Sequence, residues 1–454
     1  MVNILALLQC LEPHLETTTI RQMSRIILAM LAMTGRVTML GISRWAGKGG
    51  SYRTIQRWYS TVIPWMVVHW WFFYAHVYKP DDHYLLAGDE SVVTKSGKKT
   101  YGLDRFFSGL YGKPVAGLSF FSLSLISTQD RRSYPIMAEQ IVRTPAEKAA
   151  AKAKAQRKQA TKKAKDKVKA KAKKRKPGRP EGSKNKDKTQ VEFTPELLLI
   201  KTMIDKLLSL INGIIPISYL VMDGHFGNNN TTQLARQCGL HLISKLRVDS
   251  ALHFPYSGHD RRRKYGDKIN YGLIPAEYLK QITVEDDVLT CIYQATMRHK
   301  AFAEPLNVVI IVKVNLKTQA RAHVVLFSSD LELSDDKIID YYKLRFQIEF
   351  NFRDAKQFWG LEDFMNIKTT TVTNAANLSL FMVSLSSVLL QDFRQLNPQA
   401  GVLDLKAHFR GHKYVAETLK LLPKKPDPIL LEQIFSTVAR LGSIHTAKPG
   451  PLTS

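Results

Sequence analysis

The first 80 residues place apolar and polar positions with the period of an α-helix. Apolar residues recur every three or four positions from Ile20 to Met33, and the spacing returns in SYRTIQRWY at 51–59, after the glycine-rich turn GKGG. A helix, a short turn with glycine and a second helix carrying Arg53 and Arg57 are typical of a helix-turn-helix that contacts DNA. The alternative is a plain helical bundle. We predict a helical, helix-turn-helix-like DNA-binding domain over residues 1–80.

The most apolar stretch is VIPWMVVHWWFFYAHV at 62–77, and it is shorter than the ~20 residues that a membrane-spanning helix needs. It also contains Pro64, His69 and His76. No basic leader precedes the first apolar run of the chain, which argues against a secretory signal. We therefore expect core helices, no membrane partner and a cytoplasmic protein.

A strand pattern replaces the helical one after residue 81. The apolar run HYLLAG leads into Asp89, and two more strand-like runs follow around glycine turns up to residue 127. Thr194 and Pro195 look like an N-cap and a first helical residue, and the strand ISYLVMD ends in Asp223. A helix and a further strand reach residue 249, so these parts of the chain predict an α/β core.

Residues 250–330 are rich in strand patterns again, with NVVIIVKVNL and RAHVVLFSS separated by turns. A long helical pattern follows, which we place at about 335–359 because Ser334 offers an N-cap and Gly360 a stop. The order of strands and helices therefore predicts an α/β core that carries a β-rich insertion.

The helix at 335–359 carries polar side chains on one face that also bears aromatic residues. Tyr342, Arg345, Glu349 and Lys356 fall within an arc of about 60°. A neighbouring stripe is apolar at a spacing of four, as in a helix that packs on a core. The polar face therefore looks into a charged environment, and the alternative is a solvated face with an Arg–Glu ion pair.

Charge is distributed unevenly along the chain. The formal net charge is +27, and residues 148–188 hold 19 Lys/Arg against 3 Asp/Glu, so this basic tract carries +16 and the remainder +11. Such a charge favours a polyanionic partner, most simply nucleic acid, with an anionic membrane surface as the weaker rival. Like charges repeat at helical spacing in the tract, so we expect a disordered basic insertion over 146–190.

The basic tract contains KRKPGRPEGSKNK, which resembles an AT-hook with the core Gly178-Arg179-Pro180. Such a segment lies extended in a narrow A·T-rich minor groove, and Arg179 would enter the groove where the potential is most negative. The alternative is a solvated linker that binds phosphates without choosing a sequence. Glu181 stands where a basic residue is expected.

Two of the predicted strands end in aspartate, at Asp89 and Asp223, and open α/β sheets bind ligands at strand ends. With Glu349 they make a set of carboxylates suited to Mg²⁺ or Mn²⁺. Two such ions ~3.5–4 Å apart activate a hydroxyl and stabilise a leaving oxygen in phosphoryl transfer. The three cysteines are isolated, which argues against a zinc ribbon or a disulfide framework; they are Cys10, Cys238 and Cys291.

Other residues compete for these roles. Glu90, Asp81 and Asp82 lie close to Asp89, and we prefer Asp89 as the first ligand because it follows the apolar run directly. His225 lies two residues after Asp223, but a turn histidine is the simpler interpretation, so we leave it out of the catalytic set.

The helix predicted at 335–359, which we call the signature helix, resembles that of the cut-and-paste DDE transposases of bacterial insertion sequences. The resemblance is to the group marked by Tyr-x2-Arg-x3-Glu-x6-Lys. Tyr342, Arg345, Glu349 and Lys356 reproduce this spacing in full. GDESVVTKSGKKTYG resembles the family's first-aspartate strand with its hairpin, and VMDGHFGNNN resembles its second-aspartate strand. The resemblance covers roughly residues 1–395.

The resemblance implies an RNase H-like core in three parts, at 81–145, 191–249 and 331–395, with the β-rich insertion at 250–330. It implies that Asp89, Asp223 and Glu349 bind two Mg²⁺ ions, and that Tyr342, Arg345 and Lys356 bind DNA. No chemistry is assigned to residues 396–454. Members of the group can hold a flipped base with a tryptophan of the insertion, but all six tryptophans lie outside it. The stacking role would then fall to a tyrosine such as Tyr256, Tyr265 or Tyr271.

The resulting hypothesis is a transposase that cuts DNA at the terminal repeats of an element and joins the ends to target DNA. It would act as a homodimer in a synaptic complex, in the bacterial cytoplasm and associated with the nucleoid. Two alternatives are a non-catalytic DNA-binding relic or regulator and a metal-dependent nuclease of the same fold. An intact set of acids argues against the relic, whereas strand-transfer products would separate the transposase from the nuclease.

Overall fold

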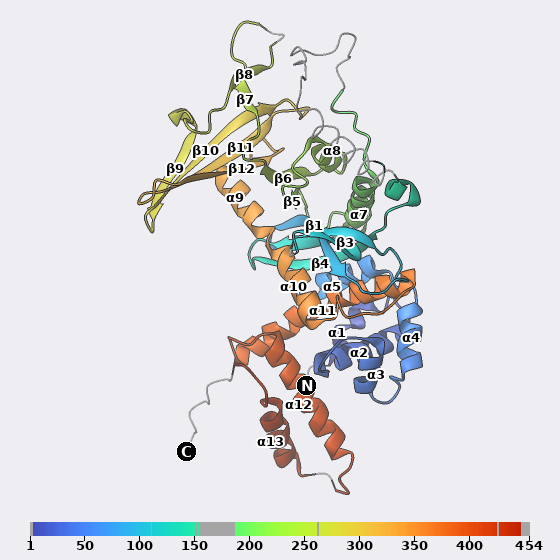
Figure 1. The fold of residues 1–454 in the computed structure, drawn as a ribbon. Helices are drawn as coiled ribbons and strands as arrows, with labels where there is room; N and C mark the ends of the chain where they lie inside the picture. Colours follow the sequence, from blue (N-terminus) through green and yellow to red (C-terminus); the bar gives the residue numbers. More distant parts are fainter. Residues whose placement is uncertain are drawn as a thin grey trace, which may run out of the picture.

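One large mixed sheet runs through the middle of the protein (Figure 1). Helices cover one half of this sheet, and the other half extends away from them. The structure is a computed structural model, and it describes residues 3–109, 111–149, 153, 187–260, 263–424 and 426–445. Within these residues, twelve strands join in the order β2-β3-β1-β5-β6-β12-β11-β10-β7-β8, with β4 beside β3 and β9 beside β10.

The N-terminal residues are helical, as their periodicity predicts. Side-chain caps begin several of these helices; the Thr38 hydroxyl, for example, accepts a hydrogen bond of 3.0 Å from the Gly41 N–H. A short 3₁₀ turn at Gln9–Leu11 follows the first of five helices, which form one group. These helices are α1 (Ile4–Leu7), α2 (Thr17–Ala32), α3 (Met39–Ala46), α4 (Tyr52–Ser60) and α5 (Trp65–His76).

The core half of the sheet combines antiparallel and parallel pairs. β1 pairs antiparallel with β3 and parallel with β5, and β5 in turn pairs parallel with β6. This mixed α/β arrangement is consistent with an RNase H-like core. The strands are β1 (Tyr84–Thr94), β2 (Asp104–Ser108), β3 (Lys113–Ser127), β4 (Arg132–Ile141), β5 (Tyr219–Met222) and β6 (His241–Leu246).

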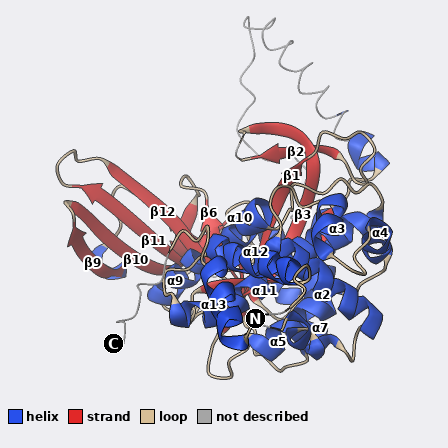
Figure 2. Ribbon diagram, turned by 90° about the horizontal axis from the view of Figure 1, so that it is seen from below, coloured by secondary structure: helices blue, strands red, loops and turns tan. Residues whose placement is uncertain are grey.

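The second half of the sheet is the β-rich stretch between the second aspartate and the signature helix. It continues the core sheet because β12 pairs antiparallel with β6, and in Figure 2 its strands extend away from the helices. Its strands are β7 (Leu252–Pro255), β8 (Tyr265–Lys268), β9 (Leu279–Glu285), β10 (Val288–His299), β11 (Leu306–Asn315) and β12 (Arg321–Ser328).

The helix predicted at 335–359 is two helices, α9 (Asp335–Leu344) and α10 (Gln347–Phe358). Arg345 and Phe346 between them keep right-handed helical angles, but the N–H groups of Phe346 and Glu349 bond three residues back instead of four. The prediction of one helix is therefore wrong, because a tight turn separates α9 from α10 without interrupting the apolar period. Gly360, with φ of +81°, ends α10 as expected.

Helices pack on both faces of the core sheet. One apolar cluster joins the N-terminal helices, one sheet face and α9 to α12, and a second joins the other face to the helices after the basic tract. α11 is long and apolar enough to cross a membrane, but 83% of its most apolar window is buried inside the protein. The remaining helices are α7 (Pro195–Ile211), α8 (Asn229–Gln237), α11 (Thr369–Leu396), α12 (Val402–Leu419) and α13 (Pro428–Ala439).

Candidate active site

Asp89 and Asp223 lie at the same edge of two neighbouring parallel strands. The register pairs Gly88 of β1 with Met222 of β5, and each aspartate is the next residue. Successive side chains of a strand point to opposite faces, so Asp89 shares the face of Leu85 and Ala87, which is the face that packs with α10. The strand register therefore directs Asp89 toward the signature helix and brings it close to Asp223.

Arg345 joins the signature helix to the first aspartate. Its guanidinium donates one hydrogen bond of 3.2 Å to the Asp89 carboxylate and another of 3.0 Å to the Glu349 carboxylate. The Arg–Glu ion pair considered from the sequence is thus present and only partly solvated, since 12% of the Arg345 side chain and 43% of the Glu349 side chain are exposed. A single cation lies between two carboxylates that come from different elements.

The electrostatics of Asp89 reflect its burial in this group. Burial raises the pKa of Asp89 to about 6, and the Arg345 charge and the N–H of Glu90 oppose that rise. The negative charges of Asp223 and Glu349 add to it. Since these charges act on one another, the three carboxylates form one electrostatic group.

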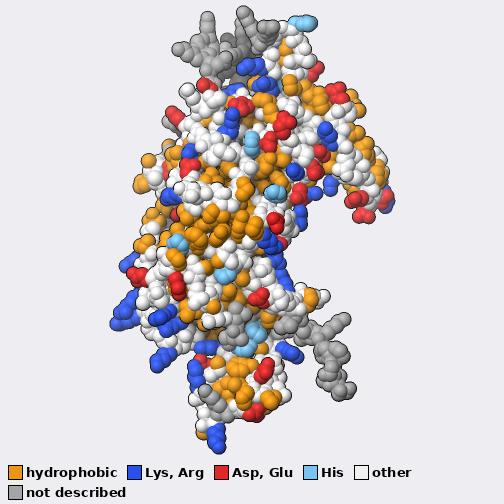
Figure 3. Space-filling view, turned by 180° about the vertical axis from the view of Figure 1, so that it is seen from behind, with side chains coloured by type: hydrophobic (Ala, Val, Ile, Leu, Met, Phe, Trp, Pro, Cys, Tyr) orange, Lys and Arg blue, Asp and Glu red, His pale blue; other side chains and the backbone are white. Residues whose placement is uncertain are grey.

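Tyr342 lies one turn before Arg345 and belongs to the same surroundings. Its ring centroid is 5.9 Å from the Arg345 guanidinium carbon, and burial raises the pKa of its hydroxyl, a rise to which Asp223 and Asp89 add. Tyr342 also lines a hollow of about 490 Å³ between α9 and the insertion strands. In the space-filling view, the surface is recessed between the insertion and the body of the protein (Figure 3).

Lys356 lies farther along α10 and is held by the first strand. Its ammonium group donates a hydrogen bond of 2.9 Å to the Val92 carbonyl and lies 3.7 Å from the Glu362 carboxylate. Burial lowers its pKa, and the Glu362 charge opposes that shift. Thus three of the four signature residues gather at the acids, while Lys356 lies about 10 Å beyond Glu349, at 1.5 Å of helix rise per residue.

The competing acids have other partners. Asp82 is buried and accepts hydrogen bonds from Thr128 and Gln129, as well as from the Ser127 hydroxyl, whereas the Asp81 carbonyl accepts one from Gln129. These contacts fasten the turn after β3.

Two further residues near the aspartates, Glu90 and His225, also make contacts of their own. Glu90 points to the sheet face opposite Asp89 and accepts a hydrogen bond from the Ser119 hydroxyl. The backbone N–H of His225 donates to the Asp223 carboxylate at 3.0 Å, which is a turn contact. Among these neighbours, Asp89 is the acid that faces Arg345 and the signature helix.

The carboxylates suit a hard divalent cation. Among the described residues, no group of three or more His, Cys, Asp and Glu side chains is gathered closely enough to hold a metal ion as it stands. The Arg345 guanidinium lies between Asp89 and Glu349, so the positions of these oxygens are already arranged around a positive charge. A donor set made only of carboxylate oxygens fits Mg²⁺ or Mn²⁺.

The other predicted DNA-binding residues lie away from the acids. Arg53 and Arg57 are exposed on α4, which is capped by Ser51 and follows α3 across the glycine turn. Arg179 and the AT-hook-like segment fall outside the residues that the structure describes.

The three insertion tyrosines each contact a neighbour within the insertion. Tyr271 stacks on His323 with ring centroids 4.5 Å apart, Tyr265 lies against His253, and the Tyr256 ring lies under the Arg263 guanidinium. None of these contacts involves the carboxylate group, so a stacking role for a flipped base stays a prediction.

One cationic group near the site was not singled out in the sequence. Lys95 follows β1 directly, and its ammonium group donates to the carbonyls of Glu362 and Phe364 at 3.0 and 2.9 Å. The available signal was the run KSGKK just after the first-aspartate strand. A loop of lysines is common on protein surfaces, so only the contact with residues 362–364 distinguishes it.

Comparisons with known proteins agree with this geometry. Residues 9–301, well over half of the chain, match the family described as DDE superfamily endonuclease. Residues 295–397 match the family described as archaeal putative transposase ISC1217. The first match contains Asp89 and Asp223, and the second contains Glu349. No curated protein matches the chain.

Proposed function

The chain belongs to the DDE superfamily of endonucleases, and from this premise we propose that it is a transposase that cuts DNA at the ends of a mobile element and joins them to target DNA. The family implies phosphoryl transfer of the nuclease type. The observation that carries the proposal is the meeting of Asp89 from β1, Arg345 from the turn before α10 and Glu349 from α10, beside Asp223.

In this proposal Asp89, Asp223 and Glu349 hold two divalent cations, Mg²⁺ or Mn²⁺. Bound there, such ions lower the pKa of an attacking hydroxyl and stabilise the leaving oxygen. The three side chains would hold these ions at a fixed place relative to β1, β5 and α10. The buried surroundings of Asp89 strengthen every charge interaction within the site.

Arg345, Tyr342 and Lys356 position the DNA strand. Arg345 has a planar fork that suits two phosphate oxygens, and it lies beside the acids where the scissile phosphate must come. Lys356 is a point charge farther along α10 and binds a neighbouring phosphate. Tyr342 lines the hollow next to the insertion and bounds the path of the strand on that side.

The partner in this proposal is DNA, both the terminal repeats and the target, and two copies of the chain act together in the synaptic complex. α4, with exposed Arg53 and Arg57, supplies recognition of the terminal repeat. The basic tract around Arg179 adds affinity for A·T-rich DNA. The protein acts in the cytoplasm, where the chromosomal DNA of a bacterium lies.

A second candidate is a nuclease of the same fold that cuts but does not join. The same carboxylates serve both reactions, so the acids do not separate the two. A DNA-binding relic without catalysis is disfavoured, because Asp89, Asp223 and Glu349 are all retained and two of them are tied to one arginine.

The test incubates the purified full chain with duplex DNA of its element's end, target DNA and Mg²⁺, and resolves cleaved and joined products. Asp89→Ala, Asp223→Ala and Glu349→Ala are compared with Asp81→Ala, an exposed acid outside the group. Joined products that all three variants lose and Asp81→Ala keeps establish the transposase. Cleavage without joining selects the nuclease, and binding without any metal-dependent product refutes catalysis.

A further inference from the structure

β1 runs beside α10 and the turn before it, and three contacts follow one another along this stretch. Arg345 meets Asp89, and Lys356 meets the Val92 carbonyl. The third contact comes beyond the ends of both elements, where Lys95 meets the carbonyls of residues 362 and 364. From Asp89 to Lys95, the contacts of this row lie progressively farther from the carboxylates and closer to the N-terminal helices.

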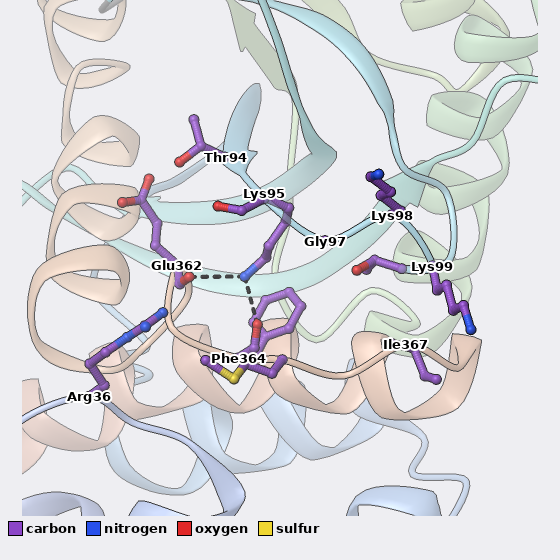
Figure 4. Close-up of a pocket in the computed structure, with 12 residues that line it drawn as sticks. Arg36, Thr94, Lys95, Gly97, Lys98, Lys99, Glu362, Phe364 and Ile367 are labelled. Atoms are coloured by element: carbon purple, nitrogen blue, oxygen red, sulfur yellow. Dashed lines mark hydrogen bonds between the residues drawn. The ribbon is translucent and has the colours of Figure 1, made fainter.

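A pocket of about 680 Å³ lies at the far end of the row, and we call it the Lys95 pocket. It is formed by the loop at 94–100, the segment at 362–367 and Arg36 of the α2–α3 connection. In Figure 4, Lys95 reaches across to the backbone at Glu362 and Phe364, and Lys98 and Lys99 lie on the other side of the loop. Three distant segments of the chain therefore enclose one cavity.

The role of Lys95 itself is structural. Its ammonium group donates to two carbonyls and lies 3.6 Å from the centroid of the Phe364 ring. These contacts hold the loop at 94–100 against the segment at 362–367, which fixes the shape of the pocket. A ligand must therefore be bound by other groups of the rim.

Lys98 and Lys99 are the cations of the rim that are free to bind an anion. Both are exposed, and no carboxylate of the described residues lies within ion-pair distance of either. Arg36, the third rim cation, is paired with Asp363 at 3.3 Å. Four cationic side chains line the pocket, and with Glu362 in its lining and Asp363 beside Arg36 they face two carboxylates, so its field still favours an anionic ligand.

The floor of the pocket is apolar. Met365 and Ile367 line it, and these residues are 67% and 52% exposed. The DNA backbone combines an apolar deoxyribose with a charged phosphate, so a floor of this kind beneath a cationic rim matches its chemistry. A free inorganic anion would make no use of the floor.

The Lys95 pocket is also continuous with a hollow beside α4, the helix proposed to recognise the terminal repeat. This second hollow, of about 500 Å³, shares Met365 and Ile367 with it and is lined by Tyr52 and Gln56 of α4. A ligand that passes over the Lys95 pocket therefore reaches the exposed face of α4. The two hollows and the carboxylates lie along one path.

We propose that the Lys95 pocket binds the sugar-phosphate backbone of the duplex whose end is cut at the carboxylates, with Lys98 and Lys99 as its phosphate ligands. The inference rests on the proposed function, because that function supplies the duplex. Asp89 and Lys95 are six positions apart along β1 and its extension, about 20 Å at 3.3 Å per strand residue. This distance corresponds to roughly six nucleotides of B-form DNA at 3.4 Å each.

The experiment measures binding of the duplex to the full chain without Mg²⁺, over a range of salt concentrations. For Lys98→Ala/Lys99→Ala we expect roughly tenfold weaker binding, and a plot of log affinity against log salt that is shallower by about 1.8. Lys420→Ala/Lys424→Ala removes the same charge at the far end of α12 and serves as the control. Equal slopes for the two double variants and the unmodified protein overturn the inference.

A set of duplexes, each with one uncharged methylphosphonate, locates the contact. Neutralising the phosphate about six nucleotides from the cut is expected to weaken binding to the unmodified protein and to leave Lys98→Ala/Lys99→Ala unchanged. If every position affects both proteins equally, the pocket is not a backbone site. Cleavage by the unmodified protein with Mg²⁺ is scored separately, so loss of catalysis refutes the proposed function and unchanged binding refutes only the pocket.

Discussion

The Arg345 guanidinium donates a hydrogen bond of 3.2 Å to the Asp89 carboxylate, although the two residues are 256 positions apart in the chain. Its other arm binds Glu349 at 3.0 Å, so one cation balances two acids of the same group. An arrangement of this kind opposes the rise that burial causes in the pKa of Asp89 and holds the two carboxylates close together before any substrate arrives. It also places a guanidinium group, whose fork suits two phosphate oxygens, beside the acids.

Replacing Glu349 by glutamine keeps the size of the side chain and removes its charge. We expect Glu349→Gln to lower the rate of DNA cleavage by about a thousandfold or more, since a group that acts as a unit fails when one member is lost. Affinity for end DNA should change little, because Glu349 carries no positive charge. Glu332→Gln, an exposed glutamate just before α9, is the control. A parallel loss of binding would contradict the catalytic role.

Arg345→Ala removes a cation that we place on the DNA backbone. Binding of end DNA should weaken, and its dependence on log salt should become shallower by about one, as expected for one lost phosphate contact. Arg345→Lys keeps the charge but loses the two-armed contact with Asp89 and Glu349, so it should retain the salt slope and still lose cleavage. Arg440→Ala, at the exposed end of α13, is the matched charge control. An unchanged slope in Arg345→Ala would refute the phosphate contact.

Arg53 and Arg57 test the role of α4. Each is exposed on a helix whose other face packs through Ile55 and Trp58 into the core, so replacing either with alanine should leave the fold intact. We expect each variant to bind the terminal repeat about tenfold more weakly, with a smaller loss on random DNA, since a good base contact contributes about 1–3 kcal/mol. Competition binding with the two DNAs measures this difference. Arg21→Ala on the exposed face of α2 should lower both affinities equally or neither.

The basic tract is tested by exchange of residues 154–186 for a Gly-Ser segment of equal length. The loss of affinity should be larger for A·T-rich than for G·C-rich DNA if Arg179 enters a narrow minor groove. Arg179→Ala should reproduce most of that preference, whereas Arg157→Ala removes the same charge outside the Gly-Arg-Pro core. Equal losses on both DNAs would leave a linker that binds phosphates without selecting a sequence.

Asp404 provides a test of stability that is independent of DNA. It is buried and accepts hydrogen bonds from the N–H groups of Gly401 and His445, from the Ile444 N–H and from the His445 ring. Burial raises its pKa, but these bonds outweigh burial and the net pKa lies below the ordinary 3.8. We expect Asp404→Asn to lower the free energy of unfolding by about 2–3 kcal/mol at neutral pH.

The sign of the pH dependence follows from the lowered pKa of Asp404. Its stabilisation is fully present above the ordinary pKa of 3.8 and is lost as the pH falls through the lower native value. Urea unfolding of the unmodified protein and Asp404→Asn should therefore differ by a constant amount from pH 7 to about 5, and the difference should narrow below about pH 4. Asp392→Asn, exposed on α11, is the control. A difference that grew on acidification would contradict the depressed pKa.

Much of the fold follows from local patterns in this chain. The apolar runs before Asp89 and Asp223 are β1 and β5, and the strands of the β-rich insertion fall between Leu252 and Ser328. The turn at Arg345 was missed because the apolar positions of α9 and α10 keep one period across it. Periodicity reports which face is buried, and a short 3₁₀ turn changes the helix axis with little change of face.

The sequence by itself determined the identity of the acids, the spacing of Tyr342, Arg345, Glu349 and Lys356, and the family, since these depend only on residue order. Tertiary structure alone decided that Arg345 binds Asp89, that Lys356 reaches Val92, and that the loop of Lys95 closes against residues 362–367. Each of these contacts joins segments more than 250 positions apart. Their geometry depends on strand register and on the packing of α10 along β1, and neither leaves a periodic signal in the sequence.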